Sequence, residues 1–211
     1  MNSLLSVAFL ALLTLTTVLL SVPQLLRLLR TGDPAGLSTA SLLFGAVNYT
    51  AWSVYLLRAG TWGLLVVNAL ASLVFYGVCA LALPRLRLSG SWQVPVMWAF
   101  GLTALTVVAP VLLGPVLGFG SLLTYTPQAV GVWRAVSLAG ISPVTWSLTG
   151  LEGLTWLGQS LRDGLVGGVL SGLVSAVAAA SVLLAIGWHR ASRGPTGSGA
   201  GTEWDPVASG C

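Results

Sequence analysis

The sequence predicts an all-α membrane protein of seven transmembrane helices, arranged as two parallel three-helix bundles joined by an inversion helix (3+1+3). Three observations predict this fold. The chain of 211 residues is 55% hydrophobic and only 7% charged, so most of its surface has to face lipid. Its apolar residues fall into runs of helical length. The segment around Pro23-Gln24 recurs around Pro127-Gln128, which lies 104 residues later.

Seven apolar runs are long enough for a helix that crosses a bilayer, which takes about 20 residues. The first run has no basic residue before it and exceeds the apolar segment of a cleavable signal peptide, so we interpret it as a retained helix. Because the fourth and fifth runs are continuous, we expect a turn between them near Pro110 or Gly114-Pro115. The predicted helices are residues 4–29, 38–57, 61–83, 92–109, 110–133, 142–161 and 165–188.

The internal repeat sets the expected domain boundaries. Residues 1–83 form the first bundle, 84–109 the linker and inversion helix, 110–188 the second bundle, and 189–211 a disordered cytoplasmic tail. Two repeated bundles in a membrane chain typically enclose a central pathway, which is the layout of a transporter. The identical pairs are Pro23/Pro127, Gln24/Gln128, Arg30/Arg134, Ala35/Ala139, Gly36/Gly140, Ser38/Ser142, Trp52/Trp156, Leu57/Leu161, Arg58/Arg162 and Gly60/Gly164.

Arginine, the only basic residue besides one histidine, predicts the orientation. Loops on one side carry most of the arginines, which places the N-terminus outside and the C-terminus in the cytoplasm. The absence of Lys, with many Arg, Ala, Gly and Leu residues, is typical of a GC-rich genome and indicates a bacterial plasma membrane. The two sets are Arg27, Arg30, Arg85, Arg87, Arg134, Arg190 and Arg193 against Arg58 and Arg162.

The composition argues against several classes of function. The arginines lie in predicted loops and at helix ends, so we expect no nucleic-acid binding. Cys79 and Cys211 form no disulfide framework, and we expect two free thiols. The sequence has no metal-ligand spacing, nucleophile elbow or phosphate-binding loop, so we expect no enzymatic activity, no metal and no cofactor.

Two tryptophans and two polar residues occupy equivalent positions in the repeats. Trp52 and Trp156 are one such pair, and Asn48 and Glu152 lie one helical turn before them on the same helix face. We predict that the two indoles stack on a solute from opposite bundles, with ordinary packing as the alternative. Asn68 is expected at the depth of Trp52, where it either contacts the solute or forms an interhelical hydrogen bond of about 0.6 kcal/mol.

Glu152 is the only acidic residue well inside a predicted span. A carboxylate there costs at least about 2.5–3.5 kcal/mol, so it has to face a wet cavity, be paired or be protonated. We predict that Glu152 lines the pathway; a protonated Glu bonded to a neighbouring helix is the alternative. Pro23 and Pro127 each remove a backbone hydrogen bond, which suits either a hinge or a static kink.

The Pro-Gln pair, the basic loop, the Gly-x-Ser of residues 36–38 and 140–142, and Trp52 followed sixteen residues later by Asn68 together resemble the PQ-loop superfamily. Residues 4–188 look most like the SWEET sugar transporters and their half-sized bacterial relatives, the SemiSWEETs. The resemblance implies facilitated, alternating-access uniport of a small sugar across a lipid bilayer. It leaves open whether the chain forms a homo-oligomer.

The resemblance also implies roles for single residues, and the second bundle departs from the pattern. Gly172 stands where a second Asn is expected, with Ser171 beside it, and Glu152 is not required by the sugar carriers. Two alternatives therefore stay open: a proton-coupled carrier of amino acids or other small solutes, and a receptor of the same fold that binds without transport. The implied solute contacts are Trp52, Trp156, Asn68, Asn48, Glu152 and Ser171, and the implied gating residues are Pro23, Gln24, Pro127 and Gln128.

Overall fold

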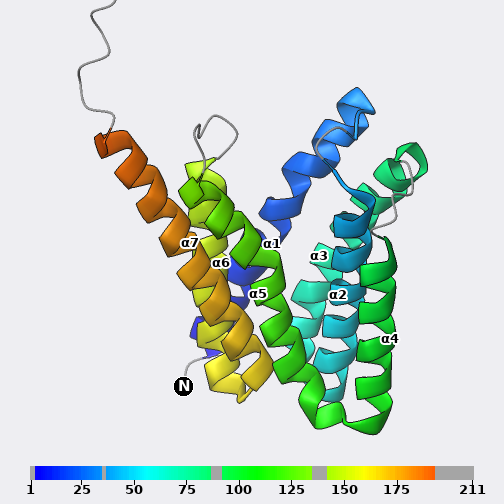
Figure 1. Ribbon diagram of the computed structural model, residues 1–211. Helices are drawn as coiled ribbons and strands as arrows, with labels where there is room; N and C mark the ends of the chain where they lie inside the picture. Colours follow the sequence, from blue (N-terminus) through cyan, green and yellow to red (C-terminus); the bar gives the residue numbers. More distant parts are fainter. Residues whose placement is uncertain (1–2, 35–36, 87–91, 135–141, 193–211) are drawn as a thin grey trace, which may run out of the picture.

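The computed structural model describes residues 3–34, 37–86, 92–134 and 142–192 (Figure 1). Within these ranges the chain is helical and contains no strand. The all-α fold with seven α-helices is therefore confirmed, and each helix lies within a few residues of its expected position. The elements are α1 (Ser3–Thr31), α2 (Thr39–Arg58), α3 (Trp62–Ala82), the short 3-10 helix η1 (Leu83–Arg85), α4 (Gln93–Val108), α5 (Pro110–Arg134), α6 (Pro143–Asp163) and α7 (Val166–Ser192).

Residues that are identical in the two repeats form the helix ends. Ser38 and Ser142 have extended backbones, and their side chains accept hydrogen bonds from the backbone N–H of Ser41 and Thr145, which caps α2 and α6. Gly60 and Gly164 follow the same two helices with φ of 69° each, a left-handed conformation that Gly adopts without steric cost. The duplicated sequence therefore sets equivalent boundaries in both halves.

The break between α4 and α5 lies at Ala109, directly before Pro110. A residue that precedes proline is pushed out of the helical region, and Ala109 has φ −142° and ψ 64°. Proline itself suits the first position of a helix, where its missing N–H has no helical partner. The expected turn at Pro110 is therefore confirmed, whereas Gly114-Pro115 lies inside α5.

The helices pack in two sets that contact each other along the middle of the molecule. α3 contacts both α1 and α2, and α7 contacts both α5 and α6 (Figure 1). α4 packs against α2 and connects to α5. Contacts of α1 with α6 and of α2 with α5 join the two sets.

Four helices are long and apolar enough to cross a membrane: Val7–Thr31, Thr39–Arg58, Trp62–Arg85, which runs on through η1, and Val166–Ser192. The outer faces of α1, α3, α4, α5, α6 and α7 carry exposed large apolar side chains, which suits contact with lipid rather than with water. The chain is thus an integral membrane protein. The sequence led us to expect seven such spans. α4 is apolar but has only 16 residues, and α5 and α6, with 25 and 21 residues, are not among the four.

The low hydropathy of α6 has a structural cause, because its polar side chains point into the bundle. Thr149, Thr155 and Gln159 are buried, whereas Leu154 and Leu161 on the outer face are exposed. A helix that is polar inside and apolar outside has a low mean hydropathy without presenting polar groups to lipid.

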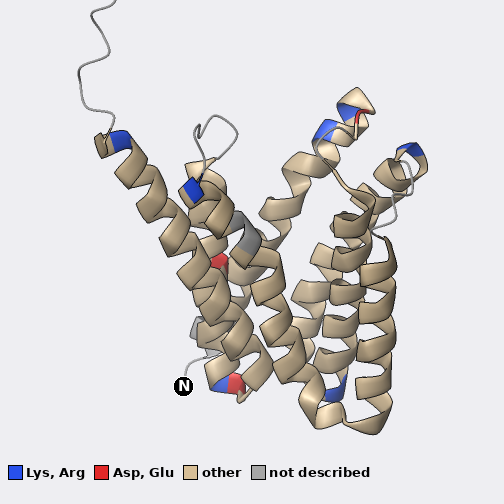
Figure 2. Cartoon of the chain, in the orientation of Figure 1, with Lys and Arg blue, Asp and Glu red and all other residues tan. Residues whose placement is uncertain are grey.

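The described arginines gather at the two ends of the bundle (Figure 2). One end, called the Arg-rich end below, carries Arg27, Arg30, Arg85, Arg134 and Arg190. The opposite end carries Arg58 and Arg162, which lie in the last turns of α2 and α6. The distribution expected from the sequence is therefore present, apart from Arg87 and Arg193, which lie outside the described residues.

The C-terminal segment differs from the sequence expectation in one respect. α7 continues through His189 to Ser192, so the start of the segment 189–211 is helical rather than disordered. The remainder of that segment, including Cys211, lies outside the described residues. Cys79 is a buried free thiol whose sulfur lies 3.8 Å from the carbonyl oxygen of Leu42.

α6 and α7 approach so closely that only glycine fits at their crossing. A Cβ atom on Gly172 would lie 2.5 Å from the backbone nitrogen of Leu157 and 2.6 Å from the carbonyl oxygen of Gly153. Both are backbone atoms, so neither can move aside without shifting a helix. Small residues at such a crossing let two helices pack closely in a membrane.

We therefore expect Gly172→Ala to lower the thermal midpoint of the purified protein in detergent, because overpacking costs about 1–3 kcal/mol. Gly187→Ala is the matched control, since Gly187 is on the same helix and a Cβ atom there would meet nothing within 4 Å. Equal midpoints for the two variants, measured by dye-based or fluorescence melting, would show that the crossing tolerates a methyl group.

Candidate functional site

A cavity of about 860 Å³ lies between the two sets of helices, a volume typical of small-molecule sites. Every one of the seven α-helices contributes to its wall. The six side chains that the sequence singled out for solute contact all lie on this wall: Asn48, Trp52, Asn68, Glu152, Trp156 and Ser171. The structure thus brings together residues that are up to about 120 positions apart in sequence, although their roles in binding remain predictions.

The cavity reaches the Arg-rich end and is closed at the opposite end. Its wall includes Ala40 and Ser41 in the first turn of α2, and Val94 and Pro95 in the first turn of α4, all near the Arg-rich end. Beyond the deep end of the cavity, an apolar cluster called the plug below fills the space between the helices. The plug consists of Leu13, Leu56, Leu64, Val67 and Leu165, which are at most 6% exposed.

Trp52 and Trp156 form the floor of the cavity, above the plug. Their ring centroids are 5.9 Å apart with an interplanar angle of 43°, and both indoles pack against the plug. A flat ring between two indoles needs about 7 Å, twice the usual carbon contact distance of about 3.5 Å. The expected arrangement, with a solute between the two indoles, therefore does not fit this conformation, because the two rings contact each other directly.

Glu152 projects from the middle of α6 into the deep part of the cavity. Its carboxylate lies beside the Thr17 hydroxyl of α1 and the indole of Trp156. Thr17 Oγ1 is buried and has no conventional hydrogen-bond partner. No arginine of the described chain contributes to the cavity wall. The sequence analysis left three states for this carboxylate: facing a wet cavity, paired, or protonated. In the structure it faces the cavity, and no cationic side chain of the described cavity wall pairs with it.

Tyr49 and Tyr125 also surround Glu152, and the sequence analysis missed both. The Tyr49 hydroxyl lies near Ser21 and the Tyr125 hydroxyl near Ser175, and both phenols lie near the carboxylate. The repeat offered no signal for them, since Tyr49 aligns with Gly153 and Tyr125 with Ser21. A search for polar aromatic residues that lack a repeat partner would have found them.

The two asparagines are held by partners within the protein. The Nδ2 atom of Asn68 donates to the Tyr49 carbonyl (3.1 Å) and to Ser53 Oγ (2.9 Å), so both of its N–H groups are used between α3 and α2. Asn48 Oδ1 accepts a hydrogen bond from Trp98 Nε1 of α4 at 2.9 Å. Asn68 therefore makes the interhelical hydrogen bonds that were the alternative to solute contact, and only its Oδ1 remains for a solute.

Ser171 and the expected gating residues occupy different surroundings. Ser171 Oγ lies 2.8 Å from Ser121 Oγ of α5, and both hydroxyls line the cavity. Pro23 and Gln24 lie within α1, outside the cavity wall. Pro127 and Gln128 lie within α5, but their side chains are outside the described part of the structure.

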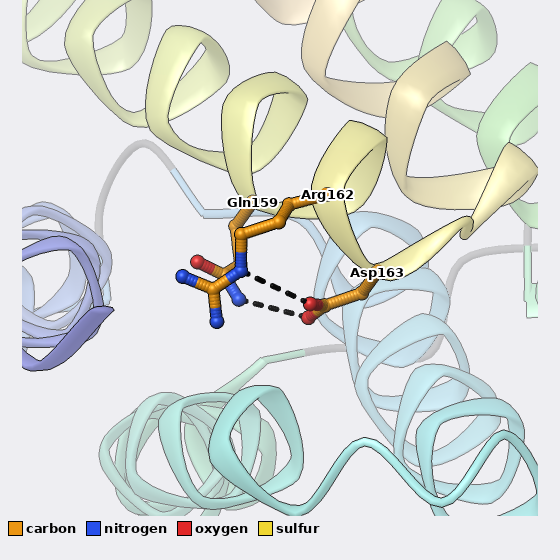
Figure 3. Close-up of polar contacts among 3 residues, drawn as sticks. All are labelled: Gln159, Arg162 and Asp163. Carbon is orange, nitrogen blue, oxygen red and sulfur yellow. Dashed lines mark hydrogen bonds and ion pairs between the residues drawn. The ribbon is translucent and has the colours of Figure 1, made fainter. Parts of the chain in front are cut away.

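Gln159, Arg162 and Asp163 form polar contacts at the end of α6 (Figure 3), and none of the three lines the cavity. Asp163 Oδ2 accepts a hydrogen bond from Gln159 Nε2 at 2.8 Å, and Asp163 Oδ1 lies 3.6 Å from Arg162 Nε. This carboxylate, unlike that of Glu152, has a cationic partner. In the described ranges, no group of three or more His, Cys, Asp or Glu residues is placed to hold a metal ion.

Neither a protein-family model nor a curated protein matches the chain. Its function therefore has to be argued from the geometry and chemistry of the cavity.

The one-sided cavity makes a testable prediction about access from the two sides of a membrane. In a Cys79→Ala, Cys211→Ser background, Thr124→Cys on the cavity wall should react with a membrane-impermeant maleimide applied from the Arg-rich side. Leu64→Cys in the plug should react from neither side, because Leu64 is 1% exposed. Labelling of Thr124→Cys from the opposite side alone would contradict the direction of the opening.

Proposed function

We propose that this chain is a membrane transporter that moves a small polar solute, of sugar size, by alternating-access facilitated diffusion. The observation that supports this most directly is a cavity lined by all seven helices that reaches one end of the bundle and is closed by the plug at the other. A transporter needs such a state, with the site reachable from one side only. The resemblance to SWEET transporters supports the same function and a sugar as the solute.

The proposal includes the arrangement expected from the sequence, in which all seven helices cross the membrane as two parallel bundles with α4 as the inversion helix. The contacts of α3 with α1 and α2, and of α7 with α5 and α6, support it because the order of packing is the same in both sets. α4 spans about 24 Å at about 1.5 Å per residue, somewhat less than a hydrocarbon core of about 30 Å. The Arg-rich end would face the cytoplasm by the positive-inside rule.

Proton-coupled transport is the second candidate function, and Glu152 is the observation that favours it. A carboxylate in a low-dielectric cavity can hold a proton and carry it with a solute. Uniport is preferred because the repeat equivalent of Glu152 is Asn48, and no second acid of the described chain lines the cavity to relay a proton.

Flux measurements on proteoliposomes test these functions against each other. We expect counterflow exchange of a radiolabelled hexose that does not depend on a pH gradient. Accumulation of sugar or amino acid driven by a pH gradient would favour proton coupling instead. Binding without flux of any solute in a panel of sugars and amino acids would indicate a receptor and contradict the proposal.

The Trp floor should be required for transport under this proposal. We expect Trp52→Ala and Trp156→Ala each to lower the rate of counterflow by on the order of tenfold, since an indole contributes both contact area and a flat surface for a sugar ring. Trp62→Ala is the control, because Trp62 is 65% exposed on the outer face of α3. If both floor variants exchange solute as the unmodified protein does while expressing normally, the solute binds elsewhere.

The prolines of the two Pro-Gln pairs should affect the rate of exchange more than solute affinity. Pro23→Ala or Pro127→Ala would restore a backbone hydrogen bond in α1 or α5 and stiffen the helix against bending. We expect the counterflow rate to fall several-fold with an almost unchanged solute Kd. Pro115→Ala, within α5 but outside the Pro-Gln pair, serves as the control. Parallel losses of affinity and rate would indicate a static kink rather than a hinge.

A further inference from the structure

The carboxylate of Glu152 lies deep in a cavity that supplies no cation to balance it. The wall consists of apolar, aromatic, amide and hydroxyl side chains, and none of its described residues is Arg or His. The nearest part of the Arg-rich end along α6 is roughly 13 Å away, taking about 1.5 Å per residue from Pro143. That distance exceeds the Debye length of about 8 Å at physiological salt, so arginines around the opening are largely screened in a water-filled cavity.

Aromatic residues line the same cavity, and three of them, Trp156, Tyr49 and Tyr125, lie near the carboxylate. Trp52 and Trp156 form the floor below it, and Tyr49 and Tyr125 lie beside it on α2 and α5. The faces of aromatic rings carry partial negative charge and attract ammonium groups. An ionised carboxylate and an aromatic ring that turns its face to a bound solute therefore act in the same direction. They attract a positively charged group and repel an anionic one, such as a sugar phosphate.

Hydroxyl and amide groups complete the lining around this carboxylate. The Thr17 hydroxyl is buried beside Glu152, and the hydroxyls of Ser121 and Ser171 also line the cavity. A hydroxyl that donates its hydrogen to a carboxylate can still accept a hydrogen bond from a ligand through its oxygen. The cavity thus offers hydrogen bonds to hydroxyl groups in addition to one negative charge.

We propose that the solute of this cavity carries one protonated amine next to hydroxyl groups, as an amino sugar does. The amine pairs with the Glu152 carboxylate near Tyr49 and Tyr125. The sugar ring of the solute rests on the floor formed by Trp52 and Trp156. The solute hydroxyls bond to groups such as Thr17. This inference rests on the proposed function, because it names the class of solute that the same cavity takes.

Equilibrium binding to the purified protein in lipid nanodiscs at neutral pH tests the inference without requiring transport. The probes are glucosamine, glucose and N-acetylglucosamine, which share a ring but differ in charge. We expect glucosamine to bind at least about tenfold more tightly than either neutral sugar, since hydrogen bonds between ionised groups are about twice as strong as neutral ones. In Glu152→Gln this preference should disappear, whereas Asp163→Asn, which removes a carboxylate outside the cavity, should retain it.

The outcomes separate this inference from the proposed function. Equal affinities for glucosamine and glucose, no detectable glucosamine binding, or a preference that survives in Glu152→Gln would each overturn the amine assignment, and hexose counterflow would still support a transporter. Selective glucosamine binding without flux into proteoliposomes would support the amine assignment and contradict transport. The comparison of ligands on the unmodified protein decides the question even if Glu152→Gln fails to fold.

Discussion

A polar side chain within the bilayer needs a partner inside the protein or a water-filled space, because lipid offers neither a hydrogen-bond donor nor an acceptor. α6 shows the consequence most clearly: Leu154 and Leu161 are exposed on its outer face, and Gln159 and Thr155 are buried on its inner face. Glu152 follows the same rule, with the cavity as its space. The site exists because the polar residues of several helices converge where lipid cannot reach them.

The repeat builds the scaffold, and the differences between its two copies supply the chemistry of the cavity. The identical residues Ser38 and Ser142 cap equivalent helices, and Gly60 and Gly164 end them. Around the cavity, in contrast, the copies diverge. Asn48 of the first copy is bonded to Trp98, whereas its equivalent Glu152 has no such partner on α4. Duplication alone would give a symmetric cavity; substitution in one copy gives it a single carboxyl group.

Much of the fold could be predicted from the sequence because hydropathy and helix-end residues act locally. The runs of apolar residues located all seven helices, and the steric effect of Pro110 on Ala109 located the turn between α4 and α5. The site was only partly predictable, because it depends on which side chain reaches which neighbour. The depth of Asn68 followed from the repeat, but its hydrogen bonds to Tyr49 and Ser53 did not. Tyr125 was missed because nothing in the repeat marks it.

The contact between Trp52 and Trp156 links the floor of the cavity to the plug. Both indoles pack against the plug and against each other, so under the proposed function an opening of the plug toward the opposite end would separate the two indoles. That separation loses the contact between the rings. Under the proposed function, a solute ring that lies on the indoles restores the lost aromatic contact once they part. A ligand shifts an equilibrium only by its difference in affinity for the two states, and this geometry provides such a difference. Under the proposed function, the closed floor is therefore expected in the solute-free protein, and the same two residues would tie solute binding to the opening of the plug.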